Sequence, residues 1–94
     1  MEESKIERYL KKKIELLNGK AYKFVSPGIS GVPDRIVLLP HGRIVFVELK
    51  APGKKLRKLQ EIRFKELRNL GFRCEMIDSI EAVNEFVGEF KNEI

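Results

Sequence analysis

Two apolar segments separated by a three-residue turn constrain the fold of this chain more than any other feature. Residues 34–39 and 43–50 are rich in branched and aromatic side chains, which favour β-strands. Pro40-His41-Gly42 lies between them, and its glycine suits the positive φ of a three-residue hairpin loop. The sequence therefore predicts an antiparallel hairpin in which Leu39 pairs with Arg43.

The register of this hairpin brings charged side chains together at its open end. It places Asp34 directly opposite Glu48, with the two Cβ atoms about 5 Å apart on one face of the sheet. Lys50 projects from the same face because it lies two residues beyond Glu48. Two facing carboxylates destabilise a sheet unless positive charge lies between them. Metal-assisted phosphodiester hydrolysis needs such a set, with oxygen ligands for Mg²⁺ and a lysine for the nucleophile or the developing charge.

An ordinary cross-strand charge network is the alternative interpretation of these residues. The apolar neighbours Val45, Phe46, Val47 and Leu49 indicate a largely buried strand, where charged groups rarely lie without a purpose. The flanking sequence therefore favours a functional site.

Hydrophobic periodicity predicts the remaining helices and strands. The expected fold is α/β, a single domain of residues 1–94 with the order α-β-β-β-α-β-α and a mixed central sheet flanked by helices. Asn18 and Gly71 can end the first two helices in a left-handed conformation, and Asp78-Ser79-Ile80-Glu81 resembles a capping box that opens the third. The expected helices are 4–17, 55–70 and a last one through Phe90, and the expected strands are 21–25, 34–39, 43–50 and a central 72–77. The buried face of the second helix is expected to carry Leu56, Leu59, Ile62, Leu67 and Leu70, with a weaker signal at Phe64.

Charge is distributed unevenly along the chain. The net charge is +5, but residues 50–73 hold nine basic and two acidic side chains, whereas residues 74–94 hold one basic and six acidic. This asymmetry favours a polyanion-binding face, although a soluble charged helix would have the same composition. The single cysteine, Cys74, excludes an internal disulfide and a cysteine-based zinc site, and we expect a buried structural thiol in a reducing cytoplasm. The apolar runs are too short for a membrane span, and we expect neither a signal peptide nor a membrane partner.

Three motifs occur in order on suitable elements, and together they resemble the VRR-NUC family. They are Gly31-Val32-Pro33-Asp34-Arg35, Val45-Phe46-Val47-Glu48-Leu49-Lys50-Ala51 and Leu59-Gln60. This family is a branch of the PD-(D/E)xK nuclease superfamily, which includes restriction-type endonucleases and Holliday-junction resolvases. The resemblance extends from about Glu7 to Phe90 and implies a restriction-endonuclease-like core.

The resemblance implies a role for each matching residue in a Mg²⁺- or Mn²⁺-dependent nuclease. Asp34 and Glu48 match the metal-binding carboxylates, and Leu49 would contribute its backbone carbonyl. Lys50 matches the catalytic lysine. Gln60 matches the family glutamine on the following helix, which helps to orient the lysine or the water.

Glu7 matches an acidic residue on the first helix that can complete the metal site. Ser4-Lys5-Ile6-Glu7 also forms a capping-box pattern, so helix capping explains this glutamate equally well. His41 lies in the hairpin loop, where we interpret it as a polar turn residue.

Basic residues near the expected site are candidate nucleic-acid contacts. They are Lys54, Lys55, Arg57 and Lys58 after the catalytic strand, and Arg8 and Lys12 on the first helix. Arg35 adjoins Asp34, but strand alternation directs it to the opposite face. Contacts from lysine and arginine to phosphates give salt-dependent affinity with little readout of base identity. We therefore expect a structure-selective DNA endonuclease that acts on junctions, flaps or ends.

Two other functions compete with this interpretation. Intact Asp34, Glu48, Lys50 and Gln60 count against a catalytically inactive nucleic-acid-binding module of the same fold. A nuclease acting on RNA stays open, because no residue recognisably reads or rejects a 2′-hydroxyl. A chain of 94 residues presents a single active site, so cutting or gripping branched DNA favours a homodimer. The resemblance also suggests an intracellular protein encoded by a phage or prophage.

Overall fold

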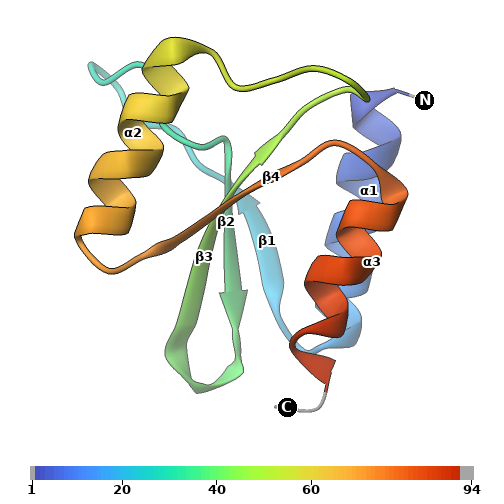
Figure 1. The fold of residues 1–94 in the computed structure, drawn as a ribbon. Helices are drawn as coiled ribbons and strands as arrows, with labels where there is room; N and C mark the ends of the chain where they lie inside the picture. The colour runs from blue at the N-terminus through green and yellow to red at the C-terminus, as the bar shows by residue number, and fades with distance from the viewer. Residues whose placement is uncertain (1, 92–94) are drawn as a thin grey trace.

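The computed structural model describes residues 2–91, and within them the elements follow one another in the predicted order (Figure 1). They are α1 (Glu3–Leu16), β1 (Lys20–Lys23), β2 (Arg35–Leu39), the 3₁₀ turn η1 (Pro40–Gly42), β3 (Arg43–Leu49), α2 (Lys58–Asn69), β4 (Arg73–Ile77) and α3 (Ile80–Gly88). Met1 and residues 92–94, the ends of the expected domain, lie outside the described residues. None of the described helices is long and apolar enough to cross a membrane.

The strands form a mixed sheet in the order β1-β2-β3-β4. β1, β2 and β3 pair antiparallel in chain order, and β4 pairs parallel with β3. β4 therefore lies at an edge of the sheet that the described residues form, and the prediction of a central strand was wrong. Its apolar residues are explained by cover on both faces, because Cys74 packs beside Phe64 while Ile77 belongs to the core on the other side.

The hairpin between β2 and β3 has the predicted register, in which Leu39 pairs with Arg43 and Arg35 with Val47. His41 and Gly42 adopt φ values of 69° and 73°, and these two left-handed residues close the turn. His41 is thus a turn residue, as predicted. A turn of fixed length sets which residues face each other at the opposite end of the hairpin.

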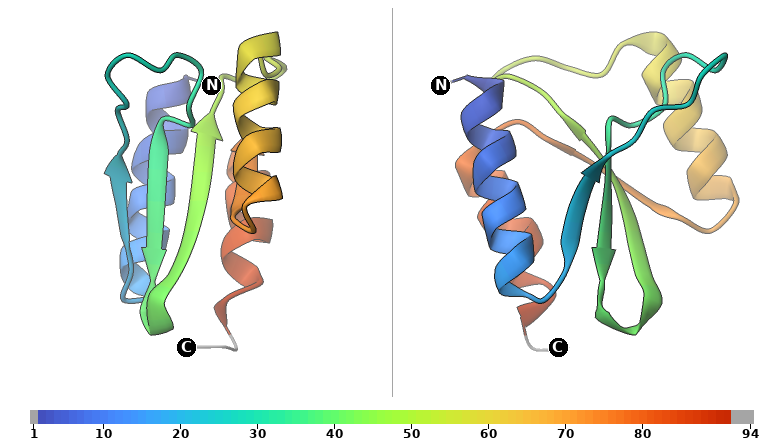
Figure 2. Two further views of the ribbon diagram at one scale, coloured as in Figure 1. Left: turned by 90° about the vertical axis from the view of Figure 1, so that its left-hand side faces the viewer. Right: turned by 180° about the vertical axis from the view of Figure 1, so that it is seen from behind.

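The helices cover the two faces of the sheet unequally. α1 and α3 lie together on one face, and α2 lies on the other face next to β4 (Figures 1 and 2). Ile6, Leu10 and Ile14 recur at helical spacing along the buried side of α1 and pack with Val37 and Val47 of the sheet. This is the larger of the two apolar cores.

The smaller core lies between the sheet and α2. Phe46 of β3, Phe64 of α2 and Cys74 of β4 form its buried centre. Cys74 is the buried thiol that the sequence predicts, and burial raises its pKa. Because alternate residues of a strand share a face, Glu48 projects from the same face as Phe46, beside α2.

α2 begins three residues later than predicted and buries a narrower stripe than predicted. Its buried residues are Gln60 and Phe64, one turn apart, while Leu59, Ile62 and Leu70 are exposed. The predicted apolar face is confirmed in part: Leu56 and Leu67 pack half-buried against the core around Phe64, while Leu59, Ile62 and Leu70 do not. A helix near one edge of a sheet buries only a narrow stripe, and the Phe64 ring fills its centre.

The helix ends follow the local signals with one correction. Asn18 and Gly71 adopt φ values of 64° and 95° after α1 and α2, as predicted. The N-cap of α3 is Ser79, whose hydroxyl accepts a hydrogen bond from the Ala82 N–H at 3.0 Å. The predicted capping box over residues 78–81 was therefore displaced by one residue, and alanine at the third helical position cannot return a hydrogen bond.

Candidate active site

Two carboxylates meet at the open end of the β2–β3 hairpin. Asp34 immediately precedes β2, and Glu48 is the next-to-last residue of β3. The Asp34 N–H donates a hydrogen bond to Glu48 Oε1 at 3.2 Å, and the Leu49 N–H donates one to Asp34 Oδ1 at 3.2 Å. Each carboxylate is thus held by the backbone of the opposite strand, in the juxtaposition that the register predicts.

Lys50 joins this pair from the end of β3. Its Nζ lies 3.6 Å from Glu48 Oε2, and its side chain is only 15% exposed. The Lys50 N–H donates to the Ile77 carbonyl at 3.0 Å, which ties the backbone at this point to β4. The ammonium therefore extends from a fixed backbone position and has little freedom to leave Glu48.

Gln60 connects the carboxylates to α2. Its Oε1 accepts a hydrogen bond from the Arg57 N–H at 2.8 Å, at the start of the helix. An N–H can only donate, so the amide is oriented with Nε2 toward Glu48, and Nε2 donates to Glu48 Oε2 at 3.1 Å. Gln60 is 4% exposed, and both ends of its side-chain amide are used. The glutamine therefore orients Glu48 and caps the N-terminus of α2.

Burial dominates the electrostatics of the two carboxyl groups. It raises the pKa of Asp34, against the opposing effects of the Leu49 N–H and the Arg35 charge. Burial also raises the pKa of Glu48; the charge of Asp34 adds to this shift, and Lys50 opposes it. Both shifts favour the protonated form of the carboxyl groups over the ionised form.

Arg35 lies on the opposite face of the sheet from Glu48, as alternation predicts, and it connects Asp34 to α1. Its guanidinium forms an ion pair with Glu7, donates to the Asp34 carbonyl oxygen at 2.9 Å and lies 3.7 Å from Asp34 Oδ2. The Glu7 carboxylate is therefore engaged with a largely buried arginine. Its role as a metal ligand stays a prediction.

The capping interpretation of Glu7 was wrong. α1 begins at Glu3, so Ser4 lies inside the first turn and its hydroxyl donates to the Glu2 carboxylate at 3.2 Å. The residue in the N-cap position is Glu2, which makes no side-chain cap. Glu7 therefore lies too far along the helix to form a capping box.

Glu3 is an acidic residue near the site that sequence reasoning missed. It lines the same pocket as Glu48 and Lys50, and its charge contributes to the raised pKa of Asp34. Glu3 precedes Glu7 by one helical turn, so both project from one side of α1. That spacing could have identified it.

A pocket of about 390 Å³ opens beside Glu48. The side chains of Glu48, Lys50 and Gln60 line it together with three of the predicted contact residues, Lys54, Lys55 and Arg57. The other predicted contacts lie outside this pocket, with Lys58 exposed in the first turn of α2 and Arg8 and Lys12 exposed on α1. The basic segment before α2 therefore shares one opening with Glu48 and Lys50, whereas Asp34 does not line it.

The loop between β1 and β2 is docked on α2 at Gly31. A Cβ on this glycine, whose φ is 85°, would lie 2.8 Å from Leu59 Cγ and 3.0 Å from the Leu59 carbonyl oxygen. Arg63 Nε donates to the Ser30 carbonyl at 2.9 Å and holds the same loop. The glycine of the first motif thus permits the close approach that holds the loop beside Gln60.

The donor set fits a hard divalent cation. Among residues 2–91, no group of three or more His, Cys, Asp or Glu side chains gathers closely enough to hold a metal ion. Mg²⁺, however, is often bound by one or two carboxylates together with waters and substrate phosphate. Two adjacent carboxylates whose pKa values are raised by burial suit that mode, and the backbone carbonyl of Leu49 lies at the same strand end.

Comparisons with known proteins identify the family and the fold of this chain. The family model described as "VRR-NUC domain" matches residues 2–80. A protein of Acyrthosiphon pisum secondary endosymbiont phage 1, named "Putative nuclease p44", is 48% identical over 77 residues, which are 82% of this chain and 83% of that protein. A solved structure of a "VRR_NUC domain" matches with a TM-score of 0.87 and 30% identity, covering 94% of this chain and 96% of that one.

Proposed function

This chain belongs to the VRR-NUC domain family, and from this premise we propose that it is a Mg²⁺- or Mn²⁺-dependent, structure-selective DNA endonuclease. The observation that carries the proposal is the set of Asp34, Glu48, Lys50 and Gln60 at one end of the sheet, joined by hydrogen bonds and by the ion pair of Lys50 with Glu48. A binding module without catalysis would gain nothing from placing the buried Glu48 beside the half-buried Asp34, because burying two adjacent carboxylates costs stability.

Asp34 and Glu48 would hold the metal ion, with the Leu49 carbonyl as a further oxygen ligand. When bound, Mg²⁺ or Mn²⁺ would supply a Lewis acid for the phosphate and for a water molecule. The hydrogen bonds from Asp34, Leu49 and Gln60 fix both carboxylates before any ligand arrives. Such preorganisation reduces the entropy that binding would otherwise cost.

Lys50 would act on the scissile phosphate. In hydrolysis the water oxygen forms a bond to phosphorus, the bond from phosphorus to the ester oxygen breaks, and a proton passes from water to the leaving oxygen. An ammonium fixed beside the phosphate stabilises the negative charge that develops on its oxygens. The contact between Lys50 Nζ and Glu48 Oε2 holds the ammonium at the edge of the pocket where that phosphate would lie.

The DNA backbone would follow the basic side of the pocket. Lys54, Lys55 and Arg57 line it, and Lys58 follows on α2. These side chains can reach phosphates, which are common to every sequence, so selectivity would depend on DNA shape. Junctions or flaps are the proposed substrates. A homodimer would present two active sites to branched DNA, and a phage or prophage origin is supported by the phage relative.

A cleavage panel tests the proposal. The purified protein is incubated with single-stranded, duplex, flap and four-way-junction DNA and with RNA counterparts, in Mg²⁺, Mn²⁺ or EDTA. We expect cleavage of branched DNA with either metal and none with EDTA. The matched control for contaminating nucleases is the Lys50→Ala protein, purified by the same procedure. Binding without cleavage under every condition would identify a binding module, and preferential cleavage of RNA would change the substrate class.

A further inference from the structure

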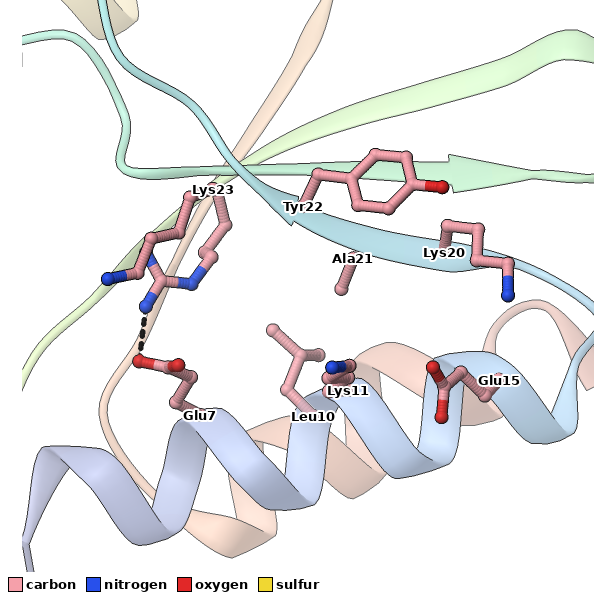
Figure 3. A pocket seen from close by; sticks show the side chains of 9 residues that line it. Glu7, Leu10, Lys11, Glu15, Lys20, Ala21, Tyr22 and Lys23 are labelled. Atoms are coloured by element: carbon pink, nitrogen blue, oxygen red, sulfur yellow. Dashed lines mark hydrogen bonds and ion pairs between the residues drawn. The ribbon is translucent and has the colours of Figure 1, made fainter.

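A groove of about 450 Å³ runs between α1 and β1, at the edge of the sheet that lies away from α2 (Figure 3). Leu10 of α1 and Ala21 of β1 point toward each other across it, and charged side chains lie on both sides (Figure 3). None of the residues that line this groove lines the pocket at Glu48. It is therefore a second concave surface, separate from the candidate active site.

The groove has a positive charge balance. Its charged lining residues are Lys11, Lys20, Lys23, Arg35, Glu7 and Glu15. Because Arg35 forms an ion pair with Glu7, three lysines face one remaining carboxylate. A groove with this balance attracts the phosphates of a nucleic-acid backbone.

Tyr22 adds an aromatic surface at the rim of the groove. It is 53% exposed although it belongs to a strand, and its ring lies on the far side of β1 from α1 (Figure 3). A basic groove beside an exposed aromatic ring is the combination that binds single-stranded nucleic acid, because the cations contact the backbone while a base stacks on the ring. Duplex DNA offers its phosphates but keeps its bases stacked inside.

Arg35 connects the groove to the candidate active site. The same guanidinium that lines the groove donates to the Asp34 carbonyl oxygen and lies 3.7 Å from Asp34 Oδ2. A strand that follows the groove toward Arg35 therefore reaches the side chain that holds Asp34, at the same end of the sheet as Glu48.

We propose that the groove between α1 and β1 binds a single-stranded segment of the nucleic-acid substrate adjacent to the scissile phosphate. Lys20 and Lys23 would contact its phosphates, and Tyr22 would stack on one of its bases. The inference rests on the proposed function and makes it more specific. The basic residues near α2 would hold duplex, while the groove selects substrates with an unpaired strand, such as a flap.

Fluorescence anisotropy in EDTA measures binding without cleavage. The three probes are a single strand, a blunt duplex and the same duplex with a single-stranded flap. We expect Tyr22→Ala to weaken binding of the single strand and the flap about tenfold and to leave duplex binding unchanged. The double variant Lys20→Ala/Lys23→Ala should weaken binding of the same two probes. It should also reduce the magnitude of the slope of log association constant against log salt concentration by about 1.4.

Matched variants separate stacking and charge from general damage. Tyr22→Phe keeps an aromatic ring and should bind like wild type, and Lys20→Arg/Lys23→Arg should keep the salt dependence. Lys5→Ala/Lys65→Ala removes the same charge from exposed positions outside the groove and outside the pocket at Glu48. An equal loss of single-strand binding in that variant would overturn the inference, as would an equal effect of Tyr22→Ala on single strand and duplex.

Cleavage of the flap substrate with Mg²⁺, measured in parallel, separates the two levels of the proposal. If the wild-type protein cleaves the flap but Tyr22→Ala still binds single strands with wild-type affinity, the proposed role of the groove is refuted. The nuclease proposal then stays intact. A wild-type protein that binds no nucleic acid would refute both.

Discussion

The Gln60 side chain donates a hydrogen bond from Nε2 to Glu48 Oε2 at 3.1 Å while its Oε1 accepts the Arg57 N–H at 2.8 Å. One buried amide therefore fixes a carboxylate at the end of β3 and the first turn of α2. The position of the helix and the orientation of the carboxylate form one structural unit. A change in either should affect both stability and catalysis.

Gln60→Ala tests this connection. The substitution removes a donor from a buried carboxylate and an acceptor from the Arg57 N–H, so we expect a loss of about 2 kcal/mol in unfolding free energy. For a domain of this size that corresponds to a decrease of roughly 10 °C in Tm, and cleavage should decrease as well. Thermal unfolding is the measurement. Glu61→Ala, at the next and exposed position, is the control and should change little.

Lys50→Ala should abolish most of the cleavage while leaving folding and DNA binding nearly intact. A fixed cation or hydrogen-bond donor at a reacting group contributes about 10²–10³-fold to kcat, so a loss of that order is expected. Single-turnover cleavage, DNA affinity and Tm are measured on one preparation. Wild-type turnover in a folded Lys50→Ala protein would contradict the catalytic assignment, and a failure to fold would favour the ordinary cross-strand network.

Glu7→Gln and Glu3→Gln distinguish the two acidic residues of α1. Glu7→Gln removes the carboxylate that pairs with Arg35, whose side chain is 9% exposed. The substitution should lower the free energy of unfolding by about 2 kcal/mol. Glu3 is exposed and its charge opposes that of Asp34, so Glu3→Gln should leave Tm unchanged or slightly raised. A Glu7→Gln protein as stable as wild type would mean that the ion pair contributes nothing, and Glu7 would then be free to bind metal.

Gly31→Ala should disrupt the contact between the β1–β2 loop and α2. Gly28 is the matched control, because it has nearly the same φ, 83° against 85°, but a Cβ added there would meet no atom within 4 Å. Both substitutions carry the strain of a left-handed residue, about 1 kcal/mol. Gly31→Ala should lower the free energy of unfolding more than Gly28→Ala does, because Leu59 must move. It should also lower cleavage, because Gln60 follows Leu59 in the chain. Equal losses of stability would mean that the contact is unimportant.

The hairpin and its carboxylates could be predicted because they depend on local chemistry. A three-residue turn leaves one register for the flanking strands, and alternation then decides that Asp34, Glu48 and Lys50 share a face while Arg35 does not. No information from distant parts of the chain was needed. Only the function of these residues required the family resemblance.

The parts that could not be predicted depend on contacts between distant segments. Periodicity shows that α2 is amphipathic, but how much of its apolar side is buried depends on where the helix lies on the sheet, so Phe64 is buried while Leu59 and Leu70 are exposed. The partner of Glu7 is 28 residues away, and capping and metal binding were equally consistent with its sequence position. The groove beside Tyr22 needs α1 and β1 side by side, which neither segment indicates alone.

The last prediction concerns the charge of Asp34 and Glu48 as pH changes. Burial raises the pKa of both groups above the values of the unfolded chain. The folded, metal-free protein therefore holds these protons more tightly than the unfolded chain does. The resulting stabilisation is complete below the unfolded pKa values, near 4, and is lost as pH rises through the raised folded values. Asp34→Asn removes one of the two charges, so its advantage over metal-free wild type should grow from pH 4 to pH 7.

Mg²⁺ or Mn²⁺ should act in the opposite direction over the same range of pH. A cation that binds the folded state stabilises it by mass action, by about 2.7 kcal/mol at one hundred times Kd, but only where the carboxylates are ionised. The increase in Tm caused by metal should therefore rise with pH in wild type and be largely absent in Asp34→Asn. Thermal unfolding of both proteins at several pH values, with EDTA and with millimolar metal, is the measurement. An identical metal response in the two proteins would show that Asp34 is not a ligand, and a response independent of pH would exclude both carboxylates.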